Sequence, residues 1–124
     1  KDGIYAAALL VEMLAVTGKS VSELYREVVQ IYGELHYAEV SLAFDPTRRE
    51  ELKRRIYEER QVPGFVVPID RIRYDDGCKV YFADGSWVVC RFSGTEPVLR
   101  IAAEGATAEW ARVYIDRWRE LLAL

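Results

Sequence analysis

Turn-forming residues at three places divide the second half of the chain into short strand-forming segments. Asp75-Asp76-Gly77 and Asp84-Gly85 are typical of tight hairpin turns, and the stretch from Arg91 to Arg100 contains Ser93-Gly94-Thr95 and Pro97. Short turns of this kind join antiparallel neighbours. The pattern therefore predicts four consecutive antiparallel strands, over residues 69–74, 79–83, 86–92 and 98–103.

Two further elements complete the pattern. Residues 35–44 alternate weakly as a strand, and Asp45-Pro46 then forms the N-cap and first residue of a helix that runs to about Arg60. A final helix over residues 108–122 carries Trp110, Val113, Tyr114, Trp118, Leu121 and Leu122 to cover the sheet. The order strand, helix, four strands, helix predicts an α+β two-layer sandwich.

Two helices are predicted before this sandwich. Residues 4–16 are apolar nearly all round, which predicts a well-buried helix that Gly18 closes. Ser20 and Glu23 form a capping box at the start of a second helix, which ends at Gly33.

Composition limits the function classes. A chain of 124 residues with 51% hydrophobic and 30% charged residues is one domain, or one domain and a piece of another, with a real core. Its net charge of −3 argues against a broad nucleic-acid surface, although a local pocket can still be positive. Because there is neither an apolar run of the ~18 residues that a membrane span needs nor a signal peptide, we expect a cytoplasmic protein with no membrane partner.

The two cysteines also indicate a cytoplasmic protein. If Asp84-Gly85 is a two-residue turn, Cys78 and Cys90 fall on opposite faces of the sheet and cannot form a disulfide. Reduced thiols then indicate the cytoplasm. The same register places Trp87 opposite Phe82 as an aromatic pair of the core.

The stretch from Arg91 to Arg100 has the chemistry of an anion site. Gly94 allows a backbone conformation in which successive N–H groups point into one concavity, and Ser93 and Thr95 add hydroxyl donors. Arg91 and Arg100 add guanidiniums suited to bidentate contact with phosphate oxygens. For Ser-Gly-Thr alone, a polar turn without a ligand is the alternative.

Arg91-Phe92-Ser93-Gly94-Thr95-Glu96-Pro97, with Arg100, resembles the phosphate-binding loop of the α-D-phosphohexomutases, the family of phosphoglucomutases, phosphomannomutases and phosphoglucosamine mutases. In that family the loop belongs to the last of four domains and holds the phosphate of the sugar phosphate. The resemblance implies phosphate contacts from Arg91, Ser93, Gly94 and Thr95. It implies for Arg100 either a further contact or an ion pair with Glu96 that braces the loop.

A second match lies near the N-terminus. Lys1-Asp2-Gly3-Ile4, Gly18-Lys19 and Ser22-Glu23-Leu24 are similar to the segment that closes the third domain of the same family. The resemblance thus divides the chain into residues 1–34, the helical end of domain 3, and residues 35–124, the phosphate-binding domain 4, with few contacts between them. For domain 4 it implies a fold like that of the TATA-box-binding protein.

The resemblance implies an isomerase that interconverts the 1- and 6-phosphates of glucose or mannose through a phosphoserine enzyme with Mg²⁺. The family's motifs for the catalytic serine, the aspartate cluster and the sugar-reading loop do not occur here. We therefore assign no catalytic residue, no metal ligand and no cofactor to this chain. We expect a C-terminal part that is inactive alone, whose partners are a hexose phosphate and the N-terminal domains of the same enzyme.

A second class of function stays open, a non-enzymatic nucleic-acid or anion-binding α+β module. It would present basic and aromatic residues on one exposed sheet face, and Tyr74, Tyr81, Phe82 and Trp87 supply aromatic rings. The acidic balance and the lack of an RNA-recognition motif argue against it, so no nucleic acid is expected as a partner.

Other chemistry finds little support. His36 is the only histidine, and no zinc site or catalytic triad can be assembled around it. Asp75, Asp76 and Asp84 are interpreted as turn formers.

Overall fold

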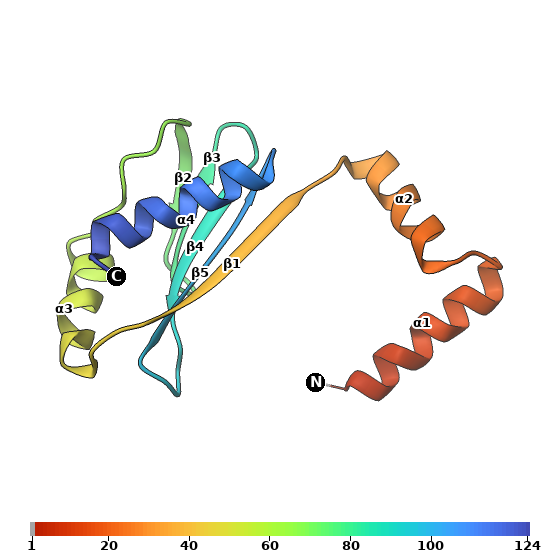
Figure 1. Ribbon diagram of the computed structural model, residues 1–124, viewed down its shortest axis with the longest axis horizontal. Coiled ribbons are helices and arrows are strands. Elements are labelled where there is room, and N and C mark those ends of the chain that lie inside the picture. The colour runs from red at the N-terminus through yellow and green to blue at the C-terminus, as the bar shows by residue number, and fades with distance from the viewer. Residues whose placement is uncertain (1) are drawn as a thin grey trace. The chain divides into compact units, whose positions relative to one another are not determined.

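The computed structural model describes residues 2–124, which form two compact units that divide between Glu34 and Leu35 (Figure 1). Each unit has its own helices, and the second also contains the sheet. The assignment of the units to two domains of one longer enzyme stays a prediction.

The first unit consists of α1 (Gly3–Thr17) and α2 (Val21–Tyr32), with the predicted caps. Gly18 ends α1 in the left-handed conformation at φ 66°. Ser20 and Glu23 form the capping box of α2, in which the Ser20 N–H donates to Glu23 Oε2 at 2.8 Å. Both predicted helices are confirmed.

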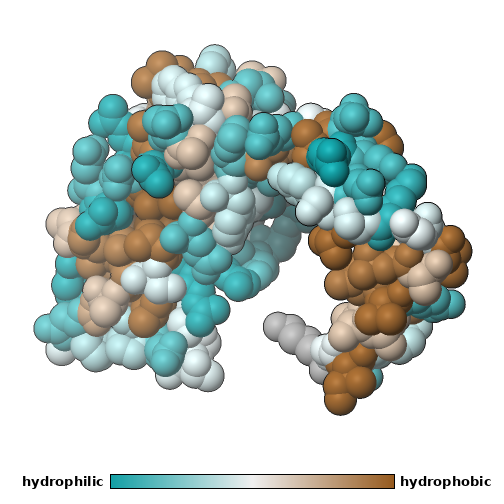
Figure 2. Space-filling model, turned by 45° about the vertical axis from the view of Figure 1, so that its right-hand side comes forward, coloured by the Kyte–Doolittle hydropathy of each residue, from teal (hydrophilic) through white to brown (hydrophobic). Residues whose placement is uncertain are grey.

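The predicted burial of α1 is wrong in this chain. Neither α1 nor α2 has a buried residue, and Ile4 is 86% exposed. Figure 2 shows the apolar side chains of α1 as a brown surface. A helix that is apolar all round needs cover on several sides, and its unit supplies only one further helix. No single described helix is long and apolar enough to span a membrane, and α1 and α2 pass that test only as a pair bent by 87°.

The second unit is built on a five-stranded antiparallel sheet in the order β1-β5-β4-β3-β2. The strands are β1 (His36–Ala43), β2 (Ile69–Arg73), β3 (Cys78–Phe82), β4 (Trp87–Phe92) and β5 (Val98–Gly105). A helical segment of η1 (Pro46–Arg48), α3 (Arg49–Lys53) and η2 (Arg54–Glu58) precedes β2, and α4 (Ala108–Leu122) ends the chain. The predicted α+β fold is confirmed.

The core lies between one face of the sheet and the helices. Leu52 and Ile56 from the helical segment, and Tyr114 and Trp118 from α4, are buried against the strands. Trp110 and Val113 were also expected to cover the sheet, but they are 38% and 36% exposed. The buried residues of α4 follow a 3.6-residue period, which leaves Trp110 and Val113 at the edge of the buried face of the helix. The buried residues are Ala111, Tyr114, Ile115, Trp118 and Leu122.

The β3–β4 hairpin differs from the predicted register by one residue. The Phe82 N–H donates to the Ser86 carbonyl at 2.9 Å, and the Gly85 N–H donates to the Phe82 carbonyl at 3.0 Å. The connection therefore has three residues rather than two, and Gly85 adopts φ 87° in a left-handed conformation that suits such a loop.

This register changes which side chains share a face. Cys78 lies directly opposite Cys90, and both free thiols are buried on the helix-covered face rather than on opposite faces. Trp87 pairs with Tyr81 instead of Phe82. A one-residue slip exchanges the two faces of a strand, which explains both errors. Burial raises the pKa of Cys78 to about 11 and that of Cys90 well above its usual value.

Candidate functional site

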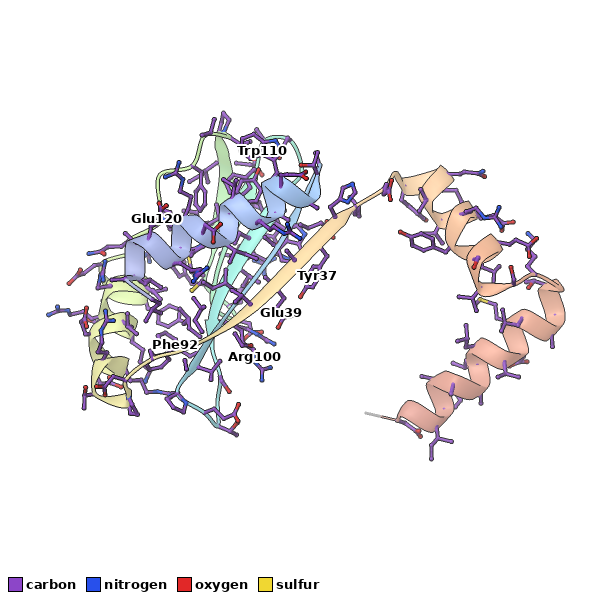
Figure 3. All side chains as sticks on the ribbon, in the orientation of Figure 1. Tyr37, Glu39, Phe92, Arg100, Trp110 and Glu120 are labelled. Carbon is purple, nitrogen blue, oxygen red and sulfur yellow. The ribbon has the colours of Figure 1, made fainter. Side chains whose placement is uncertain are left out.

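The helical segment and α4 of the second unit pack on one face of the sheet and leave its second face open. Along each strand the side chains alternate, so the neighbours of the buried residues Val88 and Ile101 point to this open face. Figure 3 shows Tyr37, Glu39 and Arg100 on the side of the sheet away from α4. Polar and aromatic side chains from all five strands meet here.

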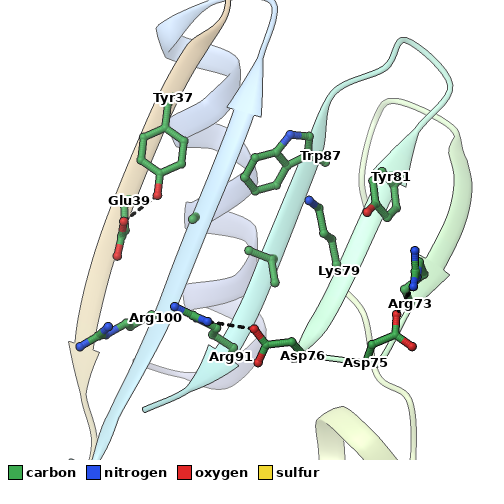
Figure 4. A pocket seen from close by; sticks show the side chains of 13 residues that line it. Tyr37, Glu39, Arg73, Asp75, Asp76, Lys79, Tyr81, Trp87, Arg91 and Arg100 are labelled. Atoms are coloured by element: carbon green, nitrogen blue, oxygen red, sulfur yellow. Dashed lines mark hydrogen bonds and ion pairs between the residues drawn. The ribbon is translucent and has the colours of Figure 1, made fainter. Parts of the chain in front are cut away.

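A pocket of about 330 Å³ lies on this open face (Figure 4). Val89 and Ala102 are directly paired on β4 and β5 and contribute small side chains to its middle. Arg91 and Arg100 lie at one end, and Trp87 lies at the other. The pocket is thus basic at one end and aromatic at the other.

Arg91 and Arg100, both predicted as anion contacts, are brought together by the fold. They are direct partners across β4 and β5, so their side chains share the open face. Like charges in this position repel each other. Asp76 Oδ2 lies 2.9 Å from Arg91 Nη1 and offsets one of the two charges.

No carboxylate of residues 2–124 forms an ion pair with Arg100. The alternative in which Arg100 pairs with Glu96 and braces the loop is therefore not realised. An anion at this end of the pocket would meet the guanidinium of Arg100, which no carboxylate of residues 2–124 pairs with. It would also meet the guanidinium of Arg91, which has five N–H groups and therefore keeps free donors beside its pair with Asp76.

The turn between β2 and β3 is built against Arg91. Gly77 has φ 89°, and a Cβ on it would lie 2.6 Å from Arg91 Cβ and 2.7 Å from the Cys90 carbonyl oxygen. Only glycine permits this approach. The turn brings Asp76 to Arg91, while Asp75 pairs with Arg73 at 2.6 Å. Sequence reasoning interpreted these aspartates only as turn formers. The contact between Asp76 and Arg91 depends on how the β2–β3 hairpin pairs with β4, which the sequence alone does not show.

The loop from Ser93 to Pro97 is held at its base. The Ser93 N–H donates to the Val98 carbonyl at 2.8 Å, and the Phe44 N–H donates to the Pro97 carbonyl at 3.1 Å. Arg49, which sequence reasoning missed, donates from Nη2 to the Ser93 carbonyl at 3.2 Å. The loop is therefore anchored both to β5 and to the helical segment.

The conformation of Gly94 gives no support to the predicted backbone concavity. Gly94 is not among the residues with a left-handed φ, and a Cβ on it would meet nothing within 4 Å. Gly94 and Thr95 are exposed, whereas Ser93 is buried. Of the five predicted anion contacts, Arg91 and Arg100 line the pocket, and Ser93, Gly94 and Thr95 lie in the adjoining loop.

Cations and aromatic rings alternate at the other end of the pocket. Lys79 Nζ lies 3.9 Å from the centroid of the Trp87 ring and 4.9 Å from that of Tyr81. Arg71 stacks on the outer side of this row, 4.2 Å from the Tyr81 centroid. Trp87 Nε1 donates to Glu104 Oε1 at 3.1 Å. Cation–π attraction and the hydrogen bond to Glu104 together hold the row in place.

Tyr37 and Glu39 complete the rim on β1. The Tyr37 hydroxyl donates to Glu39 Oε2 at 2.6 Å, and this bond raises the pKa of Tyr37. Among the described residues, no three His, Cys, Asp or Glu side chains come together as a metal site.

Comparisons with known proteins concern both units. The family model described as "Phosphoglucomutase/phosphomannomutase, C-terminal domain" matches residues 46–121. The model described as "Phosphoglucomutase/phosphomannomutase, alpha/beta/alpha domain III" matches residues 1–32.

Individual relatives agree with these models. A phosphoglucomutase/phosphomannomutase of Thermococcus kodakarensis is 34% identical over 98% of this chain and 24% of its own length. A probable phosphoglucosamine mutase of Methanothermobacter thermautotrophicus is 34% identical over 98% of this chain and 25% of its own length. The crystal structure of a putative phosphomannomutase from Thermus thermophilus superposes with a TM-score of 0.65 at 26% identity, over 100% of this chain and 23% of that one. The chain spans about a quarter of the length of these relatives.

Proposed function

The chain belongs to the phosphoglucomutase/phosphomannomutase family, and on that premise we propose that residues 35–124 bind the phosphate group of a hexose phosphate. The whole enzyme would interconvert hexose 1-phosphate and hexose 6-phosphate. The relatives are named for glucose, mannose and glucosamine phosphates, so the substrate class is a phosphorylated hexose.

One observation carries this proposal, the direct pairing of Arg91 and Arg100 on the open face. Two facing guanidiniums repel each other, and a doubly charged phosphate between them would replace that repulsion by attraction. Arg91 uses Nη1 for Asp76, which leaves its other N–H donors for phosphate oxygens. Ser93 and Thr95 in the adjoining loop would add hydroxyl donors.

The contribution of this chain is binding and orientation. Mg²⁺ would supply charge neutralisation in the whole enzyme, and Mg²⁺ requires several oxygen ligands around it. Asp75 and Asp76, the two aspartates that line the pocket, are each engaged by an arginine, so they do not fit as a metal site. We place the metal and the phosphoserine outside this chain.

The proposal is tested by titrating the 124-residue chain with glucose 1-phosphate while backbone amide shifts are recorded. We expect shifts at residues 91–96 and at Arg100, with a dissociation constant on the order of millimolar, because a few exposed contacts offset little of the association entropy. Binding should weaken as salt is added. Arg91→Ala should abolish the shifts, and Arg117→Ala, which removes an exposed arginine of α4, should not. Retained binding in Arg91→Ala would refute the proposal.

The nucleic-acid module remains the second candidate because Tyr81, Trp87 and Lys79 do share the open face. Phe82, which was counted toward such a surface, is instead buried in the core. A short single-stranded oligonucleotide that shifts the amides of β3 and β4, with residues 93–96 unaffected by glucose 1-phosphate, would favour this candidate.

A further inference from the structure

We infer that two copies of this chain associate edge to edge through β1, so that their two sheets join into one continuous sheet. The inference does not depend on the proposed function. It rests on three features of the second unit: the unprotected edge of the sheet at β1, the groove between β1 and α4, and a pattern of side chains along β1 that is complementary to itself.

The two edges of the sheet are built differently. At the β2 edge, opposite β1 (Figure 1), Pro68 precedes the strand, the pairing with β3 is interrupted between Ile69 and Arg71, and three of the five side chains are charged. Prolines, irregular pairing and charges keep an edge strand from pairing with another chain. In β1, by contrast, eight residues pair with β5 in unbroken register, and Glu39 is the only Asp, Glu, Lys or Arg. The β1 edge is therefore open to a further strand.

The backbone groups of β1 point alternately toward β5 and away from the sheet. The Phe44 N–H donates to the Pro97 carbonyl at 3.1 Å, and antiparallel hydrogen bonding repeats every two residues. Residues 36, 38, 40 and 42 therefore bond to β5, whereas residues 37, 39, 41 and 43 direct their N–H and C=O groups outward. No backbone group elsewhere in residues 2–124 bonds to these outward groups. They can accept a whole added strand.

The apolar side of β1 is incompletely covered. Ala38, Val40 and Leu42 pack against the core but are only partly buried. A groove of about 480 Å³ lies between β1 and α4, with Val40 and Ile115 among the residues that line it. A second strand beside β1 would place its own apolar side chains over this groove, and the removal of that surface from water would favour association.

The charges of the groove suit a second copy of the same edge. Arg112 and Arg119 line the groove together with Glu39 and Asp116, so the two signs are balanced. A strongly acidic or basic partner would gain little from this set. Two copies of the edge bring equal numbers of both signs and meet without net repulsion.

One register allows β1 to pair with its own copy. If the two strands run antiparallel about a two-fold axis at Val40, Tyr37 lies opposite Ala43 and Glu39 lies opposite Ser41 of the second copy. All outward positions are then used, in pairs that each exchange two hydrogen bonds. The large Tyr37 faces a small side chain. Moving the axis to Glu39 would instead place this carboxylate opposite itself, which is unfavourable.

The same register joins apolar side chains on the groove side, where Val40 meets Val40 of the second copy and Leu42 meets Ala38. The two-fold axis is perpendicular to the sheet, so the α4 helices of both copies lie on one face and both open faces lie on the other. The pairing uses the β1 edge of each copy and leaves the protected β2 edges outside. The assembly therefore closes at two copies.

The test measures association of the 124-residue chain by sedimentation, and exchange of the β1 amides by nuclear magnetic resonance. We expect a dimer with a dissociation constant on the order of 100 µM, because a contact between two strands is small. The outward amides of Tyr37, Glu39, Ser41 and Ala43 should then exchange about twofold more slowly at ~500 µM than at ~50 µM chain. Association through the exposed α1 would leave these four rates unchanged.

Two pairs of variants examine the edge and its register. Ser41→Pro removes an outward N–H and should weaken association at least about tenfold, whereas the matched control Ser41→Ala keeps that N–H and should not. With oxidised glutathione as the oxidant, Val40→Cys should form a disulfide between copies, releasing two reduced glutathiones, because residues that face each other in a pair of this type have Cα atoms about 4.5 Å apart. Leu42→Cys, which faces Ala38 in the second copy, should not form this disulfide.

Each outcome supports or overturns the inference. A chain that stays monomeric at ~500 µM would leave the edge to an extended peptide of another protein and overturn it. Association that Ser41→Pro leaves unchanged, or equal cross-linking of the two cysteine variants, overturns it as well. If Ser41→Pro loses its dispersed amide spectrum, the cysteine variants decide, because both keep every backbone N–H of β1.

Discussion

The ion pair between Asp76 and Arg91 makes a sharp prediction for the variant Asp76→Asn. The pair is exposed, with Asp76 at 80% and Arg91 at 46% of their side-chain surface, so its loss should lower the free energy of unfolding by less than about 1 kcal/mol. The fold should therefore persist. Phosphate binding is expected to become tighter, because one negative charge beside the site is removed.

The magnitude follows from Coulomb's law. Asp76 Oδ2 lies 2.9 Å from Arg91 Nη1, and a phosphate on the opposite edge of the guanidinium would be roughly 6 Å from this carboxylate, which gives about 1.4 kcal/mol of repulsion for a dianion in water. Screening at ~0.15 M salt reduces this to about 0.7 kcal/mol, or roughly threefold in the dissociation constant. The effect should rise to about sevenfold at ~0.01 M and nearly vanish at ~1 M salt.

The assay is a titration with glucose 1-phosphate at about pH 8, where the phosphate is dianionic, at these three salt concentrations. Asp75→Asn is the matched control, since it removes the same charge from the same turn but from a carboxylate that pairs with Arg73. We expect a smaller change for the control. Weaker phosphate binding in Asp76→Asn would refute the reasoning, since it would mean that the carboxylate holds Arg91 in its binding position.

Three further predictions follow from the fold. Gly77→Ala should lower the free energy of unfolding by about 2 kcal/mol or more in urea denaturation, because the φ of Gly77 is 89° and the new Cβ would lie 2.6 Å from a neighbouring side-chain carbon. Gly94→Ala, with open space around it, should change the free energy of unfolding by less than about 0.5 kcal/mol. Equal losses in the two variants would contradict this prediction. The pKa values of the buried thiols of Cys78 and Cys90 are raised in the folded chain, so the unfolded chain ionises them first, and the free energy of unfolding should fall as pH rises from ~8.5 toward about 11. Unfolding curves at about pH 7.5 and pH 10 test this. Cys78→Ala should show a smaller pH effect. The 124-residue chain should not convert glucose 1-phosphate to glucose 6-phosphate in a coupled assay. Positioning and charge stabilisation account for phosphoryl transfer, and we place the metal and the phosphoserine outside this chain. Measurable conversion would contradict this prediction.

Local chemistry was enough to predict most elements of the fold. Gly18 and the pair Ser20 and Glu23 act within one helical turn, and they mark the helix ends in the structure as they do in the sequence. The Asp45-Pro46 start is likewise present, with Asp45 Oδ1 accepting from the Thr47 N–H at 2.9 Å. Such signals need no distant partner. The α+β order of strands and helices could therefore be predicted from the chain alone.

The burial of helix side chains was less predictable, because it depends on which other elements pack against the helix. The apolar surface of α1 indicates a need for cover, but no residue pattern shows whether the cover lies in the same unit. In α4 the pattern identified Tyr114 and Trp118 correctly, whereas Trp110 is more exposed than its apolar character suggests.

The sequence by itself determined the chemistry of the candidate site, its arginines and hydroxyls, and the elements that carry them. Only the tertiary structure decided that Arg91 faces Arg100, that the turn at Gly77 brings Asp76 to Arg91, and that Trp87 lies on the open face. The physical reason is the two-residue period of a strand. A hairpin loop of three residues in place of two exchanges the faces of every following side chain, so composition and spacing cannot define a site that several strands build together.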